Sequence, residues 1–122
     1  MREQRRAPGP ARAWLDDHTG EPLGISVFVA CELEAGATAA AYPERERMRV
    51  RETLKAVAIV FPDERFAAAY GALWRQLQQR RRTLGTMDLL IATTATIEAV
   101  PVLTGDRRHF EDVPDLEVLS YR

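Results

Sequence analysis

The fold is decided by one stretch of the sequence, MDLLIATTATIEAVPVLTGD, residues 87–106. Its first part is rich in alanine and other apolar residues, and this pattern predicts a helix over residues 86–98. The run VPVLT, residues 100–104, is short, apolar and β-branched, which predicts a buried strand. A helix that leads directly into a buried strand is typical of an α/β protein, in which helices cover a parallel sheet.

The segment before this stretch alternates between strand and helix in the same way. Residues 22–28, PLGISVF, predict a strand, and Ser26 is placed to cap a helix over residues 27–36. A charged helix is predicted over residues 44–57, and it runs into the apolar strand AVAIVF, residues 56–61. The order of elements therefore implies parallel strands joined by helices.

A long helix is predicted after Asp63, which we take as its N-cap. Its apolar stripe recurs at three and four residues and is interpreted as core: Phe66, Ala69, Tyr70, Leu73, Trp74 and Leu77. LEVLSY, residues 116–121, predicts a last strand, and residues 10–20 predict a short first helix. We therefore expect an α/β protein, a three-layer α/β/α sandwich with a mostly parallel sheet.

Length and composition limit the class of protein. The 122 residues predict one domain over 1–122, with only residues 1–8 expected to be flexible. Hydrophobic residues make up 46% and charged residues 29%, which excludes a disordered chain. The formal net charge of −1 gives no general basic field, so a nucleic acid would have to be bound by local clusters of arginine.

The single cysteine, Cys31, cannot form a disulfide within the chain. It follows the apolar run 27–30, which predicts a buried thiol in a reducing compartment. No run of residues is long and apolar enough for a membrane span, and the arginine-rich start lacks the apolar segment of a secretory signal. We therefore expect a cytoplasmic protein without membrane contact.

Three acidic residues lie just beyond the predicted strands: Glu32, Asp88 and Asp106. Chemistry in parallel α/β sheets gathers at the carboxyl ends of the strands, so these side chains are expected to face one crevice. Together they predict a Mg²⁺ or Mn²⁺ site for phosphodiester hydrolysis. Each has a simpler interpretation alone: Asp88 complements a helix dipole, Asp106 organises a turn, and Glu32 is a solvated helix residue.

The same residues make the chain resemble the PIN domain, specifically the VapC-type ribonuclease toxins of bacterial toxin–antitoxin systems. The first family motif is matched by Glu32, Leu33 and Gly36, and the similarity extends from about residue 9 to the end. The later motifs are an acidic residue in an alanine-rich helix, Thr-x-Asp after a strand, an aromatic residue and Pro-x-Leu. They are matched by Asp88, Thr104, Asp106, Phe110, Pro114 and Leu116.

The resemblance implies an endoribonuclease that depends on Mg²⁺ or Mn²⁺ and cleaves RNA as the toxin of a type II toxin–antitoxin system. Glu32, Asp88 and Asp106 would be catalytic metal ligands or their close partners, with Thr104 in support. A cognate antitoxin protein is the implied partner, and we expect a homodimer.

Five arginines are candidates for contact with RNA phosphates: Arg80, Arg81, Arg82, Arg107 and Arg108. Charged residues at the end of a helix are more often simply solvated, and that interpretation stays open. His109 is interpreted as a turn or surface residue and not as a catalytic base.

The first ten residues, MREQRRAPGP, contain neither the apolar strand nor the aspartate with which proteins of the family that this chain resembles normally begin. We therefore expect strands 22–27 and 100–104 to flank an incomplete seam, from a start assigned too far downstream or from true truncation. A second function stays open, a catalytically impaired PIN-like module that binds an antitoxin or itself. A receiver-like domain is disfavoured because the only lysine is Lys55.

Overall fold

The computed structural model describes residue 17 and residues 24–120. Its elements in chain order are β1 (Gly24–Ser26), α3 (Val27–Thr38), α4 (Pro43–Lys55), β2 (Ala58–Val60), α5 (Phe66–Gln79), α6 (Thr86–Glu98), β3 (Val102–Thr104), the 3₁₀ helix η1 (Arg107–His109) and β4 (Val118–Ser120). Residues 1–8 and, apart from Asp17, the helix predicted over 10–20 lie outside the described residues.

The strands are parallel, as the sequence predicts for an α/β protein. β1 pairs with β2, with Ile25 opposite Ile59, and β3 pairs with β4, with Leu103 opposite Leu119. Within the described residues these are two separate two-stranded sheets, and no continuous sheet joins them. In the described part of the chain β1 and β3 are therefore not hydrogen-bonded to each other, and the incomplete seam expected between strands 22–27 and 100–104 stays a prediction.

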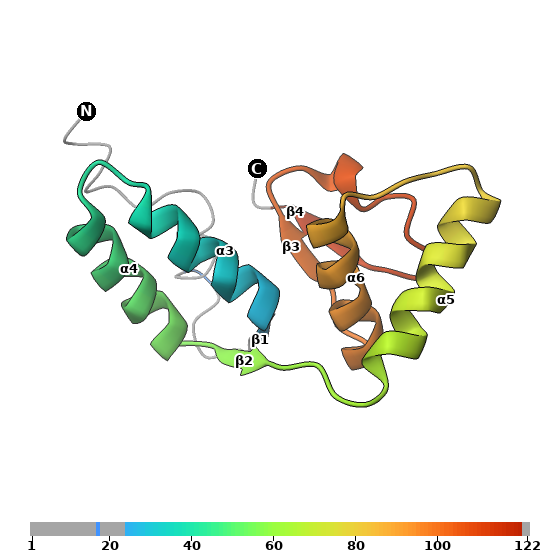
Figure 1. Ribbon diagram of the computed structural model, residues 1–122, viewed down its shortest axis with the longest axis horizontal. Helices are drawn as coiled ribbons and strands as arrows, with labels where there is room; N and C mark the ends of the chain where they lie inside the picture. Colours follow the sequence, from blue (N-terminus) through green and yellow to red (C-terminus); the bar gives the residue numbers. More distant parts are fainter. Residues whose placement is uncertain (1–16, 18–23, 121–122) are drawn as a thin grey trace.

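The helices divide the molecule into two regions. α3 and α4 pack along each other on one side of Figure 1, while α5, α6, β3 and β4 lie on the other side. β2 and the segment after it join the two regions along the lower edge of that view. α6 makes the connection between them, because it contacts α3 and β1 as well as α5 and β3.

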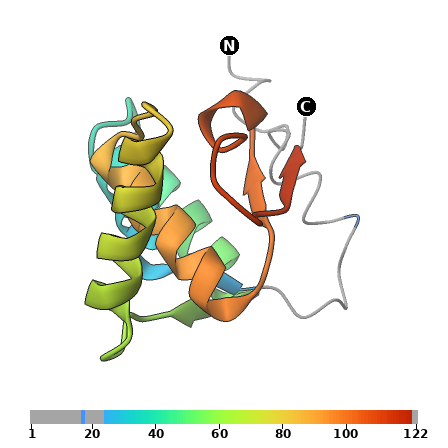
Figure 2. The same cartoon turned by 90° about the vertical axis from the view of Figure 1, so that its right-hand side faces the viewer.

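The main hydrophobic core lies around α6. Its buried members are Leu73, Leu77, Leu89, Ala92, Ala95, Val102, Phe110 and Val113. Thr93 is fully buried within the same helix, and its hydroxyl donates a hydrogen bond of 2.7 Å to the carbonyl of Leu89. The buried polar group is thereby satisfied without a partner from another element. Figure 2 shows β3 and β4 side by side and pointing the same way next to this helix.

The helix starts follow from local sequence signals. Ser26 caps α3 as predicted, because its hydroxyl accepts a hydrogen bond of 3.2 Å from the backbone N–H of Val29. α4 has Pro43 in its first turn, with Glu44 and Glu46 close behind and Lys55 in its last turn. This distribution of charge complements the helix dipole and explains why so polar a segment is helical.

The prediction that Asp63 is the N-cap of the long helix is wrong. α5 begins at Phe66, its N-cap is Arg65, and no side chain caps it. The Asp63 carboxylate instead accepts a hydrogen bond of 2.8 Å from the backbone N–H of Arg65, which forms a turn ahead of the helix. An Asp that favours a helix N-terminus also favours such a turn, so the residue type alone does not distinguish the two.

Two predictions of burial are also wrong. Trp74 is 48% exposed, although Leu73 and Leu77 of the same stripe are buried as predicted. Trp74 lies about 100° around the helix from Leu73, at the edge of the stripe and beyond its buried part. Cys31 is exposed for the same reason, because it follows the buried Ala30 by one residue on α3.

No helix in the described part of the chain is long and apolar enough to cross a membrane.

Candidate active site

Asp88 lies in the first turn of α6, as the sequence predicts. The residue after it, Leu89, is 3% exposed and belongs to the main core, so this turn is held firmly against the protein interior. The Asp88 side chain itself is 32% exposed. A half-buried carboxylate at a helix N-terminus is stabilised by the dipole and still accessible to a ligand.

Asp106 follows the end of β3 and shapes the turn after it. Its backbone N–H donates a hydrogen bond of 3.1 Å to the hydroxyl of Thr104, and its carboxylate caps η1 by accepting one of 3.0 Å from the backbone N–H of Arg108. The Arg108 guanidinium donates two more, from Nε at 3.2 Å and from Nη2 at 3.3 Å. Asp106 therefore does organise a turn, and that turn fixes where its oxygens lie.

The contacts with Arg108 also affect the ionisation of Asp106. The hydrogen bonds from the Arg108 side chain, and then from its backbone N–H, lower the pKa of Asp106 below the usual 3.8. The carboxylate is consequently a stable anion at neutral pH. An anionic oxygen donor is what a hard divalent cation requires.

His109 brings the two aspartates together. Its Nδ1 lies 3.6 Å from Oδ2 of Asp88, and its Nε2 lies 3.6 Å from Oδ2 of Asp106. The next residue, Phe110, is 4% exposed and shares the main core with Leu89, so the core itself holds η1 beside the start of α6. Each of the two carboxylates therefore lies near one nitrogen of the same imidazole ring.

This role of His109 was not predicted from the sequence. It correctly placed the residue in a turn, and the spacing of three residues from Asp106 was a signal that both side chains could lie on one face of a helical turn. Nothing in the sequence indicated the contact of His109 with Asp88, because that contact depends on the packing of η1 against α6.

Glu32 is exposed on α3 and is not gathered with the aspartates. Among the described residues, no group of three or more His, Cys, Asp or Glu side chains is arranged to hold a metal ion. The structure thus brings together two of the three predicted carboxylates, and Glu32 as a ligand stays a prediction.

The donor set at this end of α6 fits a magnesium or manganese ion by chemistry. Asp88 and Asp106 supply only carboxylate oxygens, which are the ligands that these hard cations prefer. Mg²⁺ in proteins commonly takes one or two carboxylates and fills its remaining positions with water and substrate phosphate. Two aspartates are therefore sufficient to contribute the protein's share of such a site.

The candidate arginines lie at the C-terminal end of α5 and in η1. The C-terminal end of α5, which carries Arg80, and the 3₁₀ helix η1 are both at the upper end of Figure 1. Arg82 Nε lies 3.6 Å from Oδ1 of Asp112, which ties the end of α5 to the segment after η1. Arg107 is exposed beside Arg108. Both basic clusters thus border the same end of the molecule.

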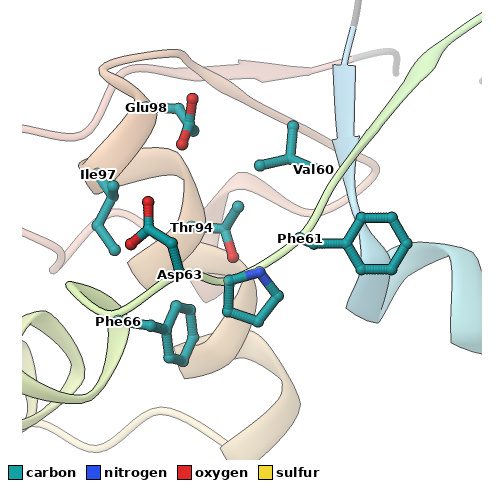
Figure 3. Close-up of a pocket in the computed structure, with 8 residues that line it drawn as sticks. Val60, Phe61, Asp63, Phe66, Thr94, Ile97 and Glu98 are labelled. Atoms are coloured by element: carbon teal, nitrogen blue, oxygen red, sulfur yellow. The ribbon is translucent and has the colours of Figure 1, made fainter.

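A small hollow lies at the other end of α6 and is drawn in Figure 3. The carboxylates of Asp63 and Glu98 stand near it, but Arg65 pairs with both, at 2.8 and 3.7 Å. The Thr94 hydroxyl donates to the carbonyl of Leu90 at 3.0 Å. Because these polar groups already have partners within the protein, the hollow is not the candidate site.

Comparison with known families decides the class of this chain. A family model described as the PIN domain matches residues 2–116. The chain belongs to the PIN-domain family. Ribonuclease VapC1 of Methanocaldococcus jannaschii is 30% identical over 108 residues, which are 88% of this PIN domain and 74% of the relative. Ribonuclease VapC19 of Mycobacterium tuberculosis is 32% identical over 100 residues, 82% of this chain and 76% of the relative.

Solved structures confirm the fold of this PIN domain. The complex VapBC2 of Rickettsia felis, bound to a DNA fragment from its promoter, contains a chain that matches with a TM-score of 0.83 and 24% identity. That match covers 94% of this chain and 87% of the other. DNA-bound VapBC from Salmonella typhimurium gives the same TM-score and identity over 97% and 89% of the two chains. The expected resemblance to VapC proteins is therefore confirmed.

Proposed function

We propose that this PIN domain is a metal-dependent endoribonuclease and the toxin of a type II toxin–antitoxin pair. The proposal rests on two supports, its similarity to named VapC ribonucleases and the pairing of two aspartates across His109. The pairing carries the chemical part, because it places two anionic oxygen donors at the end of β3 and the start of α6. That is where ligands collect in parallel α/β proteins.

Asp88 and Asp106 would hold Mg²⁺ or Mn²⁺ in this proposal. The ion, when bound, supplies a Lewis acid that activates water and neutralises charge on the scissile phosphate. Arg108 keeps the Asp106 carboxylate ionised and oriented. The Thr104 hydroxyl accepts a hydrogen bond from the backbone N–H of Asp106. The protein's own contribution is thus a fixed pair of carboxylates at the surface.

The RNA backbone would be attracted by the arginines around this pair. Arg80, Arg81 and Arg107 are exposed and are the candidates for phosphate contact, while Arg82 and Arg108 are engaged with Asp112 and Asp106. Replacing any one of the three exposed arginines by glutamine should weaken binding for all RNA sequences alike and reduce its dependence on salt. This pattern separates phosphate binding from recognition of bases.

The proposed partner rests on the same family membership. We propose that a cognate antitoxin binds and inhibits the protein, as the VapBC complexes are toxin–antitoxin assemblies. A homodimer and a cytoplasmic location stay predictions. The exposed thiol of Cys31 is compatible with a reducing compartment.

A second function has one observation in its favour. Because the described residues hold no group of three potential metal ligands, the chain could act as an impaired module that binds an antitoxin without cleaving RNA. The two functions differ in one measurable property, the metal-dependent cleavage of RNA.

The test is cleavage of RNA by the purified chain with Mg²⁺, with Mn²⁺ and with a chelator. The proposal predicts cleavage that needs the ion and falls at least about a hundredfold in Asp88→Asn and Asp106→Asn, since each loses a charged ligand. Glu32→Gln tests the third predicted carboxylate, and Glu117→Gln is a control for loss of an exposed charge. Cleavage that persists unchanged in the aspartate variants would remove the proposed site, and antitoxin binding without cleavage would favour the second function.

A further inference from the structure

We propose that His109 is a positioning residue that holds the Asp88 carboxylate toward Asp106. This inference rests on the proposed function, because it assigns the two aspartates to one metal site. It adds a residue that the three predicted carboxylates did not include.

The orientation of the Asp88 carboxylate depends on His109. Within the described part of the chain, the approach of His109 Nδ1 at 3.6 Å is the one polar contact made by the Asp88 carboxylate. The backbone of Asp88 is fixed by α6 and by the burial of Leu89, so the contact with His109 bears on the orientation of the carboxylate alone. A ligand group that is not held loses affinity, because its orientation must be fixed again when the ion binds.

His109 is held in place by neighbouring contacts, whereas the Asp88 side chain is not. Its Nε2 faces Asp106, whose carboxylate is held by three hydrogen bonds from Arg108. Its backbone closes η1 through a hydrogen bond of 3.2 Å from its N–H to the carbonyl of Asp106, and Phe110 next to it is buried. The imidazole therefore transmits the fixed position of Asp106 to Asp88.

His109 is not placed to act as a third ligand of the metal ion. Each of its two ring nitrogens lies 3.6 Å from an oxygen of a different carboxylate. A single ion can be bonded to only one imidazole nitrogen, and no group of three ligands is formed in the described residues. The ring is thus arranged to orient the carboxylates and not to bind the ion with them.

The test compares three substitutions of His109 by measuring Mn²⁺ affinity calorimetrically on the full chain. His109→Ala should weaken Mn²⁺ binding about tenfold, the usual effect of removing a group that orients a metal ligand. Asn keeps a nitrogen at the position of Nδ1, which faces Asp88, whereas Gln keeps one at the position of Nε2, which faces Asp106. His109→Asn should therefore restore most of the affinity and His109→Gln should not.

A comparison of metals separates positioning from ligation. Co²⁺ favours imidazole nitrogen more than Mn²⁺ does, so loss of a histidine ligand would weaken Co²⁺ binding by the larger factor. A positioning role predicts the same factor for both ions. Glu111→Gln, in the same turn, is the matched control and should bind both ions like the original chain.

The contacts of His109 with the two aspartates can be detected by NMR, without a metal ion and without an activity assay. The ¹⁵N resonance of His109 Nδ1 should shift in Asp88→Asn, and that of Nε2 should shift in Asp106→Asn. The inference is overturned if neither resonance responds, if His109→Ala binds Mn²⁺ as well as or better than the original chain, or if Gln restores affinity as fully as Asn. If His109→Ala does not fold, the Asn and Gln pair and the resonances still decide.

Failure of the proposed function gives a different pattern. In that case the original chain binds no Mn²⁺ at Asp88 and Asp106 and cleaves no RNA, whatever stands at position 109. If Asp88→Asn abolishes both binding and cleavage while His109→Ala changes neither, the function stands and only the positioning role is lost.

Discussion

At the scale of single residues, the sequence identifies the acids but not the residue that joins them. Asp88 and Asp106 could be predicted because each stands at the end of its own element, where local pattern decides its place. His109 could not, because its contact with Asp88 depends on how η1 packs against α6 through buried Phe110. Glu32 was placed on the correct helix, but helical position alone did not determine its neighbours.

Asp63 and Arg65 provide a prediction at this scale. The side-chain hydrogen bonds from Arg65, and then its backbone N–H, lower the pKa of Asp63 below 3.8. A lowered carboxyl pKa stabilises the fold above the unfolded pKa, and this contribution is lost as the pH falls through the folded pKa. Arg65→Gln should therefore unfold more easily than the original chain at neutral pH, with the difference shrinking as the pH falls through the lowered pKa of Asp63.

Urea unfolding of both chains from pH 7 to pH 2.5 measures this difference. Because the pair is exposed, raising the salt concentration at pH 7 should also reduce it. A difference that stays constant across the pH range would show that Arg65 stabilises the fold by packing and not through Asp63.

At the scale of elements, local sequence signals predict where helices begin and end better than they predict which side chains are buried. The helix over residues 86–98 has the bounds predicted for it, and Ser26 caps α3 as expected. Asp63 forms a turn ahead of α5, because the same side chain suits both structures. Trp74 shows that apolar spacing along a helix does not reveal how wide the buried face is.

Both helices of the main core end on a residue with left-handed backbone that is not glycine. At the end of α5, Arg81 has φ 57°, with the N–H of Arg82 bonded to the carbonyl of Leu77 at 2.8 Å. At the end of α6, Ala99 has φ 56°, with the N–H of Val100 bonded to the carbonyl of Ala95 at 3.1 Å. These are Schellman motifs, in which glycine is the favoured residue.

Ala99→Gly should therefore raise the free energy of unfolding by about 0.5–1 kcal/mol, because glycine carries no steric cost at this backbone conformation. Ala67→Gly is the matched control. It lies exposed within α5 and should lower stability by about 1 kcal/mol, since its backbone is helical. Chemical denaturation of the three chains measures both signs, and a loss in both variants would refute the role given to the α6 cap.

At the scale of the whole molecule, the core around α6 sets the geometry of the site. Leu89 follows Asp88 and Phe110 follows His109, and both belong to the same buried cluster. The class of fold and the direction of the strands followed from the alternation of elements in the sequence. The division into two separate parallel pairs depends on which strands meet, and strand pairing leaves only a weak trace in a single sequence.

Phe110→Ala should cost about 3–5 kcal/mol of unfolding free energy, because it leaves a cavity in this core. Trp74→Ala removes a larger aromatic side chain from an exposed position and should cost under about 1 kcal/mol. Thermal and urea unfolding of the two variants make the comparison. Equal losses would mean that Phe110 is not the anchor of η1.

The central claim is that Asp88 and Asp106 form one metal site, and the anomalous scattering of Mn²⁺ in crystals of the protein tests it most directly. The account predicts one strong peak within coordinating distance of an oxygen of each aspartate, absent in Asp88→Asn and in Asp106→Asn. A peak at other residues, with these two carboxylates uncoordinated in a chain that cleaves RNA, would contradict it.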